Sequence, residues 1–163
     1  MRQPYVAVVG AAIATDEETA WAEEVGRGLA EAGAVLVCGG LGGVMDAAAR
    51  GCEAAGGISV GILPGDVRAG ASSHLTVTLP SGLGEARNTL VVRAADVVIA
   101  VGGEFGTLSE IAFALKMGTP VVGLESWRLE REGMVGDPIQ RAETPSEAVA
   151  RALAAAPGRP TDG

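Results

Sequence analysis

The sequence predicts an α/β domain with a Rossmann-like, doubly wound sheet of six or seven mostly parallel strands and helices on both faces. Apolar runs of strand length alternate with helix-length segments, which is typical of a parallel α/β fold. The runs AVLVCGG and DVVIAVGG are apolar throughout, as expected of strands covered on both faces. The 163 residues suit one domain, expected at 1–157, with a frayed tail at 158–163.

The first strand is expected at 5–10, where YVAVVG forms an uninterrupted apolar run. A helix follows, because TDEE is a capping box in which Thr15 is the cap and Glu18 the third helical residue. This helix is expected to run to about Ala32, where Gly33 ends it.

Three more strands and one helix are expected up to Pro80. The strands are AVLVCGG at 34–40, ISVGILP at 58–64 and HLTVTLP at 74–80. The helix is VMDAAARGCEAAG at 44–56, between the first two of them. A proline–glycine pair stops the strand at 58–64, which places a turn there.

The next segments alternate in the same way. A helix is expected at 82–95, a strand at 96–103, a helix at 106–118 and a strand at 119–124. Residues 126–143 show no clear periodicity and leave a short hairpin and an edge strand as alternatives.

The last helix is expected at 144–156. Thr144 is the predicted cap, Pro145 the first helical residue, and Glu147 closes a capping box.

Composition excludes several classes of protein. The net charge is −8, and the 12 basic residues do not cluster in sequence, so no nucleic-acid partner is expected. No apolar run approaches the roughly 20 residues that span a membrane. The segment MRQPYVAVVG is too short for a signal sequence, which predicts a cytoplasmic protein. Cys38 and Cys52 are expected to be reduced and buried, and with only His74 beside them no metal site is predicted.

Pyridoxal phosphate and the dinucleotides NAD and FAD are also unexpected as cofactors. Lys116 is the only lysine, and its place near a predicted helix C-terminus suits the helix dipole better than a Schiff base with pyridoxal phosphate. The first strand ends in GAAIAT and lacks G-x-G-x-x-G, and the second ends in Cys38 rather than an acidic residue. NAD and FAD are therefore not expected.

Two glycine-rich segments repeat one device at an offset of 63 residues, VLVCGGLGGVM at 35–45 and VIAVGGEFGTL at 98–108. Each combines a strand, a glycine turn and a helix start. Their glycines are Gly39, Gly40, Gly43, Gly102, Gly103 and Gly106. Glycines let the backbone approach a ligand, and a helix N-terminus offers free N–H groups, so a phosphate site is predicted. A tight turn without a ligand is the alternative.

Several polar side chains are candidates for this site. Thr107 and Glu110 could contact a phosphate and a sugar, but Thr-x-x-Glu is also a capping box. Arg87 could pair with a phosphate through both arms of its guanidinium, or it could be a solvated helix arginine. Asn88 beside it could contact a ribose or base, as could Glu85. Asp46 is as readily explained as a first-turn helix residue.

The chain resembles a superfamily that includes the LOG phosphoribohydrolases, long mislabelled lysine decarboxylases, and the molybdenum cofactor carrier proteins. The LOG motif PGG-x-GT-x-x-E corresponds here to VGGEFGTLSE, and GGG-x-x-GLM to CGGLGGVM, with Met45 kept. The resemblance implies that Arg87 and Glu110 match the catalytic pair. It also implies that Gly102, Gly103, Gly106 and Thr107 match the phosphate loop.

Departures from the LOG pattern favour the carrier branch and its bacterial relatives. Val101 replaces the motif's proline, and Glu104 with Phe105 stand where the motif has one residue. A carboxylate at 104 would weaken the binding of a phosphate unless this side chain points away from the phosphate. The Met-His-Glu-Arg-Lys helix is reduced to GEARN.

Three functions follow as hypotheses. The preferred one is binding of a phosphorylated small molecule, a nucleotide or a molybdopterin-type cofactor, with no cofactor required for activity. The alternative is a phosphoribohydrolase that cleaves a nucleoside 5′-monophosphate to free base and ribose 5-phosphate. The third is a structural role with vestigial loops. The family also implies a homodimer or homotetramer.

Overall fold

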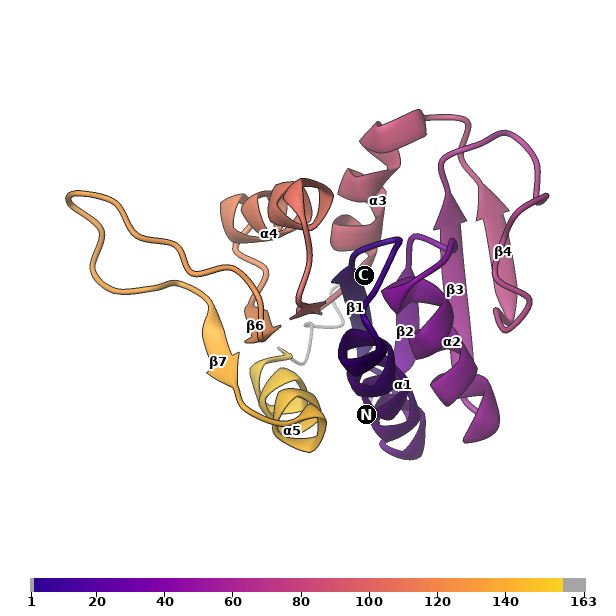
Figure 1. Ribbon diagram of the computed structural model, residues 1–163, viewed down its shortest axis with the longest axis horizontal. Coiled ribbons are helices and arrows are strands. Elements are labelled where there is room, and N and C mark those ends of the chain that lie inside the picture. The colour runs from indigo at the N-terminus through magenta and orange to yellow at the C-terminus, as the bar shows by residue number, and fades with distance from the viewer. Residues whose placement is uncertain (1, 157–163) are drawn as a thin grey trace.

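The computed structural model describes residues 2–156, and within them seven strands form one sheet in the order β4-β3-β2-β1-β5-β6-β7 (Figure 1). The strands are β1 (Tyr5–Gly10), β2 (Val35–Cys38), β3 (Ile58–Leu63), β4 (Val77–Pro80), β5 (Val97–Val101), β6 (Val121–Leu124) and β7 (Gln140–Ala142). All neighbouring strands run parallel, which confirms the predicted α/β class. The tail predicted at 158–163 lies outside the described residues.

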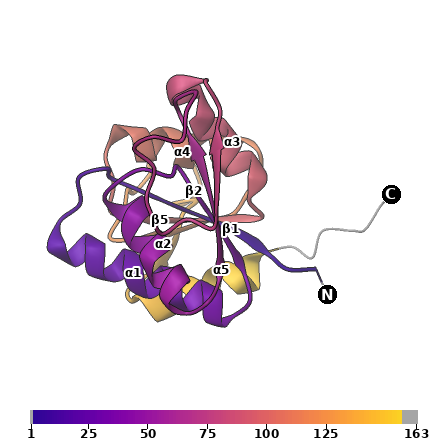
Figure 2. The ribbon, with the colours of Figure 1, turned by 90° about the vertical axis from the view of Figure 1, so that its right-hand side faces the viewer.

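Helices cover both faces of the sheet (Figure 2). They are α1 (Asp16–Glu31), α2 (Val44–Ala54), α3 (Arg87–Ala94), α4 (Phe105–Lys116) and α5 (Pro145–Ala155). One core lies between the sheet and α1, α2 and α5, and the other lies under α3 and α4. Along β1, Val6 and Val8 enter the first core while Ala7 and Val9 enter the second. A strand buried on both faces has to be apolar at every position, which explains the uniform runs.

Two helix starts follow the predicted capping chemistry. The Thr15 hydroxyl accepts from the Glu18 N–H, and the Glu18 carboxylate accepts from the Thr15 N–H, which completes the box. At α5, Thr144 accepts from the Glu147 N–H. The Glu147 carboxylate accepts instead from the N–H of Glu143, so the second half of that predicted box is wrong.

The helix predicted at 82–95 is shorter than expected. Gly82 and Gly84 have φ angles of 67° and 58°, so neither residue has α-helical backbone. A 3-10 turn at Gly84–Ala86 comes first, and α3 begins at Arg87. This late start places Arg87 at the N-terminus of α3, at the edge of the sheet where ligands bind.

Residues 126–143 contain an edge strand, the second of the two expected alternatives. β7 pairs parallel to β6, with Val122 opposite Gln140. The connection between these strands extends away from the body as an arm (Figure 1). The base of the arm lies beside the start of α4, because the Trp127 indole donates to the Glu104 carbonyl.

The strand order reverses between β1 and β5, which lie at the centre of the sheet. β2, β3 and β4 follow on one side of β1, and β6 and β7 follow on the other side of β5. In a doubly wound sheet, ligands bind beyond the carboxyl ends of the strands at such a reversal. Both glycine segments leave the sheet at this edge.

Candidate functional site

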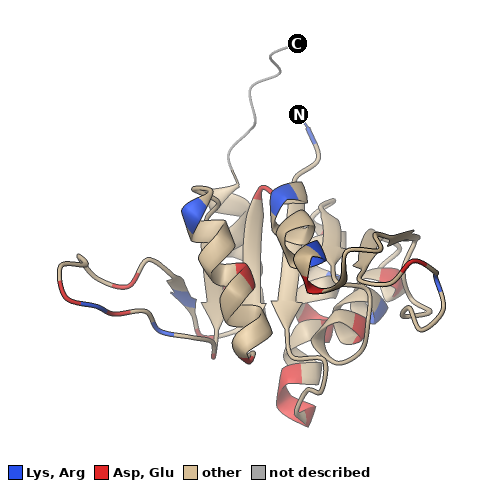
Figure 3. Ribbon diagram, turned by 90° about the horizontal axis from the view of Figure 1, so that it is seen from above, with Lys and Arg blue, Asp and Glu red and all other residues tan. Residues whose placement is uncertain are grey.

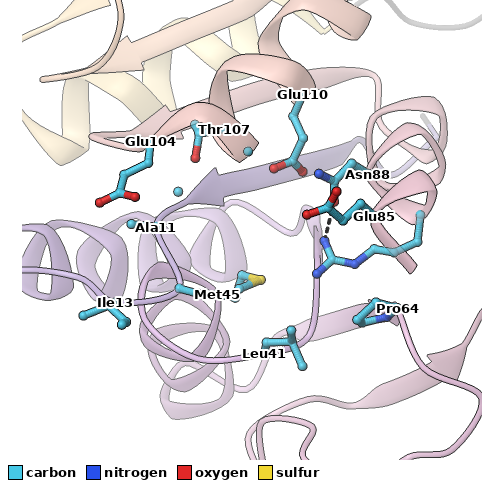
Figure 4. A pocket seen from close by; sticks show the side chains of 14 residues that line it. Ala11, Ile13, Leu41, Met45, Pro64, Glu85, Asn88, Glu104, Thr107 and Glu110 are labelled. Atoms are coloured by element: carbon cyan, nitrogen blue, oxygen red, sulfur yellow. Dashed lines mark hydrogen bonds between the residues drawn. The ribbon is translucent and has the colours of Figure 1, made fainter. Parts of the chain in front are cut away.

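A cavity of about 460 Å³ opens at this edge, within the range of small-molecule sites. Its wall is formed by the turns that follow β1, β2, β3 and β5 and by the start of α3. Figure 4 shows Glu104, Thr107 and Glu110 descending from the α4 side of the cavity, with Met45 and Leu41 facing them from the α2 side.

The structure brings most of the predicted site residues to this cavity. Its wall includes Met45, Arg87, Asn88, Gly106, Thr107 and Glu110. The other predicted glycines shape the turns behind the wall. They are Gly39, Gly40, Gly43, Gly102 and Gly103.

Arg87 is 8% exposed, so the interpretation as a solvated helix arginine is wrong. Its Nη1 donates to Asn88 Oδ1 at 2.7 Å, and its Nε is buried without a partner among the described residues. Burial lowers the pKa of Arg87, while the nearby Glu110 opposes that change. A Cβ on Gly39 would lie 2.5 Å from Nη1, so a larger residue at 39 would force the guanidinium to move.

Glu110 is not a helix cap. The glycine pair is followed by Glu104 at the N-cap of α4, and α4 begins at Phe105. Thr107 and Glu110 therefore lie inside the helix, and the predicted capping box is wrong. Glu110 is 7% exposed, and burial raises its pKa to about 7 despite the opposing charge of Arg87. A carboxyl with this pKa exchanges its proton near neutral pH.

The two glycine turns differ in how many backbone N–H groups they leave without an acceptor. At the first, the Val44 N–H donates to the Ala11 carbonyl at 3.0 Å, so the first amide of α2 is already used. Gly43 has φ 62°, and a Cβ there would lie 2.2 Å from that carbonyl. The first turn is thus packed against the turn after β1.

At the second turn, the first helical hydrogen bond runs from the Leu108 N–H to the Glu104 carbonyl. The N–H groups of Phe105, Gly106 and Thr107 therefore have no acceptor within the helix. Thr107 and Gly106 border the cavity, and a Cβ on Gly106 would meet open space. Of the two turns, this one offers more free donors.

Sequence reasoning missed the turn after β1, where Ala11, Ala12 and Ile13 form part of the wall. Its sequence lacks a dinucleotide fingerprint, so nothing in its composition pointed to a ligand. The available signal was topological, because the first strand of a doubly wound sheet lies beside the reversal point.

Charge is unevenly distributed in the cavity. The wall contains one basic side chain, Arg87, and three carboxyl groups, those of Glu85, Glu104 and Glu110. Basic residues elsewhere are dispersed over several elements (Figure 3). Within residues 2–156, no three His, Cys, Asp or Glu side chains are grouped to hold a metal ion. No helix among these residues is long and apolar enough to cross a membrane.

Comparisons with known proteins agree with this geometry. Residues 3–153 match the SLOG cluster4 family. An uncharacterized protein of Archaeoglobus fulgidus is 39% identical over 149 residues, covering 91% of this chain and 94% of the relative.

Two solved structures are similar over nearly the whole chain. The molybdenum cofactor binding protein of Rippkaea orientalis has a TM-score of 0.85 and 32% identity, covering 94% of this chain and 98% of its own. The molybdenum cofactor carrier protein of Chlamydomonas reinhardtii has a TM-score of 0.82 and 30% identity, with the same coverage of 94% and 98%. These matches confirm the superfamily predicted from the glycine segments.

Proposed function

The chain belongs to the SLOG cluster4 family, and we propose that it binds a phosphorylated small molecule, a nucleotide or a molybdopterin-type cofactor, in this cavity. The similar structures from Rippkaea orientalis and Chlamydomonas reinhardtii are molybdenum cofactor binding and carrier proteins, which supports a cofactor-type ligand.

The observation that carries the proposal is the buried guanidinium of Arg87. Its Nε is buried and lacks a partner within residues 2–156. A buried polar group without a hydrogen bond is costly, and a charged one more so. An anionic ligand group would satisfy this donor, and a guanidinium is suited to bind phosphate through two parallel hydrogen bonds.

The start of α4 supplies the second set of donors. The N–H groups of Gly106 and Thr107 stand at the positive end of the helix dipole, which favours a phosphate. The carboxylates of Glu85 and Glu104 also border the cavity. They suit hydrogen-bond donors in the rest of the ligand, such as sugar hydroxyls or the N–H groups of a base or pterin.

The replacement Gly106→Ala separates binding from stability. A Cβ on Gly106 meets no protein atom within 4 Å, and alanine is preferred over glycine in a helix by up to about 1 kcal/mol. We expect a higher unfolding temperature, but affinity for AMP or inorganic phosphate about 10-fold lower, because the methyl group enters the proposed phosphate position. A lost hydrogen bond to a charged group has this size. Thermal denaturation and calorimetric titration measure the two effects.

A matched control is Gly28→Ala in α1, a helical glycine that lies outside the cavity wall. Its alanine variant should bind AMP and phosphate like the unmodified protein. If Gly106→Ala also bound both with unchanged affinity, the phosphate would not lie at the start of α4.

Hydrolysis is the second candidate, and the pKa of Glu110 near 7 favours it. A carboxyl tuned to this range can act as general acid or base. Incubation with AMP would yield adenine and ribose 5-phosphate, separable by chromatography, if the protein is a phosphoribohydrolase. Glu110→Gln should then abolish turnover while AMP still binds. If AMP binds to the unmodified protein and stays intact, the binding function alone stands.

Assembly into a homodimer or homotetramer remains a prediction. Val77, Leu79 and Leu90 expose apolar side chains on and beside the edge strand β4, which supports self-association. Light scattering on the purified chain would give the mass directly.

A further inference from the structure

The connection between β6 and β7 forms two hydrogen bonds with the second glycine turn. The Ser126 hydroxyl donates to the Gly102 carbonyl at 2.6 Å, and the Trp127 indole N–H donates to the Glu104 carbonyl at 3.2 Å. Gly103 lies between the two held carbonyls. Neither Ser126 nor Trp127 belongs to the cavity wall, so both act from behind the turn.

The Ser126 hydrogen bond sets the direction of the Gly102–Gly103 peptide, and the Trp127 hydrogen bond reinforces the direction that the bond from the Leu108 N–H gives the Glu104–Phe105 peptide. In a planar trans peptide the C=O and the N–H point in opposite directions. The Gly102 carbonyl is directed at Ser126, so the N–H of Gly103 points away from the β6–β7 connection. The Glu104 carbonyl accepts from both the Leu108 N–H and the Trp127 indole, so the N–H of Phe105 points away from both donors.

Without these hydrogen bonds the peptide groups of the turn would be free to rotate. Gly102 and Gly103 have φ angles of 51° and 106°, and a glycine pair can rotate its peptides with little steric resistance. Phe105, one of the two residues that stand where the LOG motif has one, is 78% exposed, and its ring contacts the Trp127 ring at a centroid distance of 5.7 Å. The side of the turn remote from the cavity is therefore held by residues 126–127.

The backbone just before these residues is strained. Glu125 has φ 48°, which makes it the one residue other than glycine with a positive φ in the described part of the chain. This left-handed conformation is unfavourable for glutamate. The strained residue turns the chain directly after β6 and brings Ser126 to the Gly102 carbonyl. A strained backbone of this kind persists only where surrounding contacts hold it in place.

We propose that Ser126 and Trp127 are positioning residues for ligand binding, which orient the N–H groups of Gly103 and Phe105 as donors to the anionic group of the ligand. This inference rests on the proposed function, since it needs a ligand in the cavity. It assigns a role to a segment whose sequence shows no periodicity and no ligand motif.

The test uses the whole chain with Ser126→Ala and Trp127→Phe, of which the second keeps a ring beside Phe105 and removes the donor. Calorimetric titration with AMP and with inorganic phosphate should give affinities about 2- to 10-fold weaker for each variant, the range of one hydrogen bond. The controls are Ser146→Ala, whose hydroxyl contacts the Thr144 hydroxyl at the start of α5, and Trp21→Phe in α1. Both controls should bind with unchanged affinity.

A general loss of stability would not reproduce the accompanying NMR signature. In ¹⁵N-labelled protein, saturation with phosphate should shift the amide signals of Gly103 and Phe105. In Ser126→Ala the Gly103 shift should be the more reduced, and in Trp127→Phe the Phe105 shift.

Three outcomes decide the matter. Weaker binding in both variants with the residue-matched loss of amide shifts supports the inference. Affinities equal to those of the unmodified protein, or Gly103 and Phe105 signals that stay fixed while other cavity residues shift, overturn it and leave the proposed function intact. No binding of either probe to the unmodified protein overturns both.

Discussion

Replacing Arg87 by methionine is expected to weaken the binding of AMP and of inorganic phosphate by about 100-fold or more. Arg87 is the only basic side chain in the described wall of the cavity, and its guanidinium is buried. Truncating one partner of a buried, hydrogen-bonded charge pair costs about 2–5 kcal/mol, because the other charge is left unpaired. A difference of 1.4 kcal/mol is tenfold in affinity.

Methionine fills a similar volume without the charge, which limits the structural damage. Arg87→Lys separates charge from geometry, since an ammonium lacks the planar pair of donors and should recover only part of the affinity. Calorimetric titration of the three proteins provides the comparison. The matched control is Arg93→Met, an exposed arginine on α3 that lies outside the cavity wall. Equal losses in Arg87→Met and Arg93→Met would mean that long-range charge, and not the cavity, governs binding.

The sheet and its helices were predictable because buried parallel strands have a distinctive composition. Every position of β5 is buried, and the sequence VVIAV is apolar at each of them. The capping box at Thr15 marks the start of α1 because its two hydrogen bonds depend only on neighbouring residues. Local chemistry of this kind can be read along the chain.

The start of α4 was not predictable from local chemistry. Thr107 and Glu110 have the spacing of a cap, yet the helix begins at Phe105. Ser126 and Trp127 bind the preceding turn from a distant segment of the chain. Such long-range contacts leave no periodic pattern in the sequence. The spacing of Thr107 and Glu110 was therefore compatible both with a helix cap and with a buried carboxyl group in the cavity.

The site was only partly predictable, because some of its residues are marked by local sequence patterns and others reach it only through the fold. Glycine spacing drew attention to both turns, and the family resemblance singled out Arg87 and Glu110. The turn after β1 was missed because its contribution comes from its place at the centre of the sheet. The burial of Arg87 was missed because a single arginine on a short helix gives no indication of which way it faces.

The replacement Glu110→Gln is expected to stabilise the protein at pH 8 and to change its stability little at pH 4.5. Burial raises the pKa of Glu110 from 4.5 to about 7. Below pH 4.5 the carboxyl is protonated in both the folded and the unfolded chain. Between pH 4.5 and 7 the folded protein keeps a proton that the unfolded chain has lost, so stability falls as the pH rises.

At pH 8 the folded protein therefore bears a buried charge. A raised pKa of this size corresponds to about 3 kcal/mol of lost unfolding free energy, at 1.36 kcal/mol per pKa unit. Glutamine resembles the protonated carboxyl and does not titrate, so the variant should retain that free energy. Urea denaturation of both proteins from pH 4.5 to pH 8 measures the difference, which should grow through the window from 4.5 to 7.

Glu147→Gln provides a control of opposite sign. The N–H of Glu143 and the side chain of Arg151 lower the pKa of Glu147, so this carboxylate stabilises the fold when ionised. Its glutamine variant should therefore be less stable than the unmodified protein at pH 4.5 and above, with a difference that shrinks as the pH falls below 4.5. If the Glu110→Gln difference stayed constant from pH 4.5 to 8, Glu110 would be ionised like an exposed carboxyl. In that case general acid or base chemistry at this position would lose its physical basis, and the cavity would be left with binding alone.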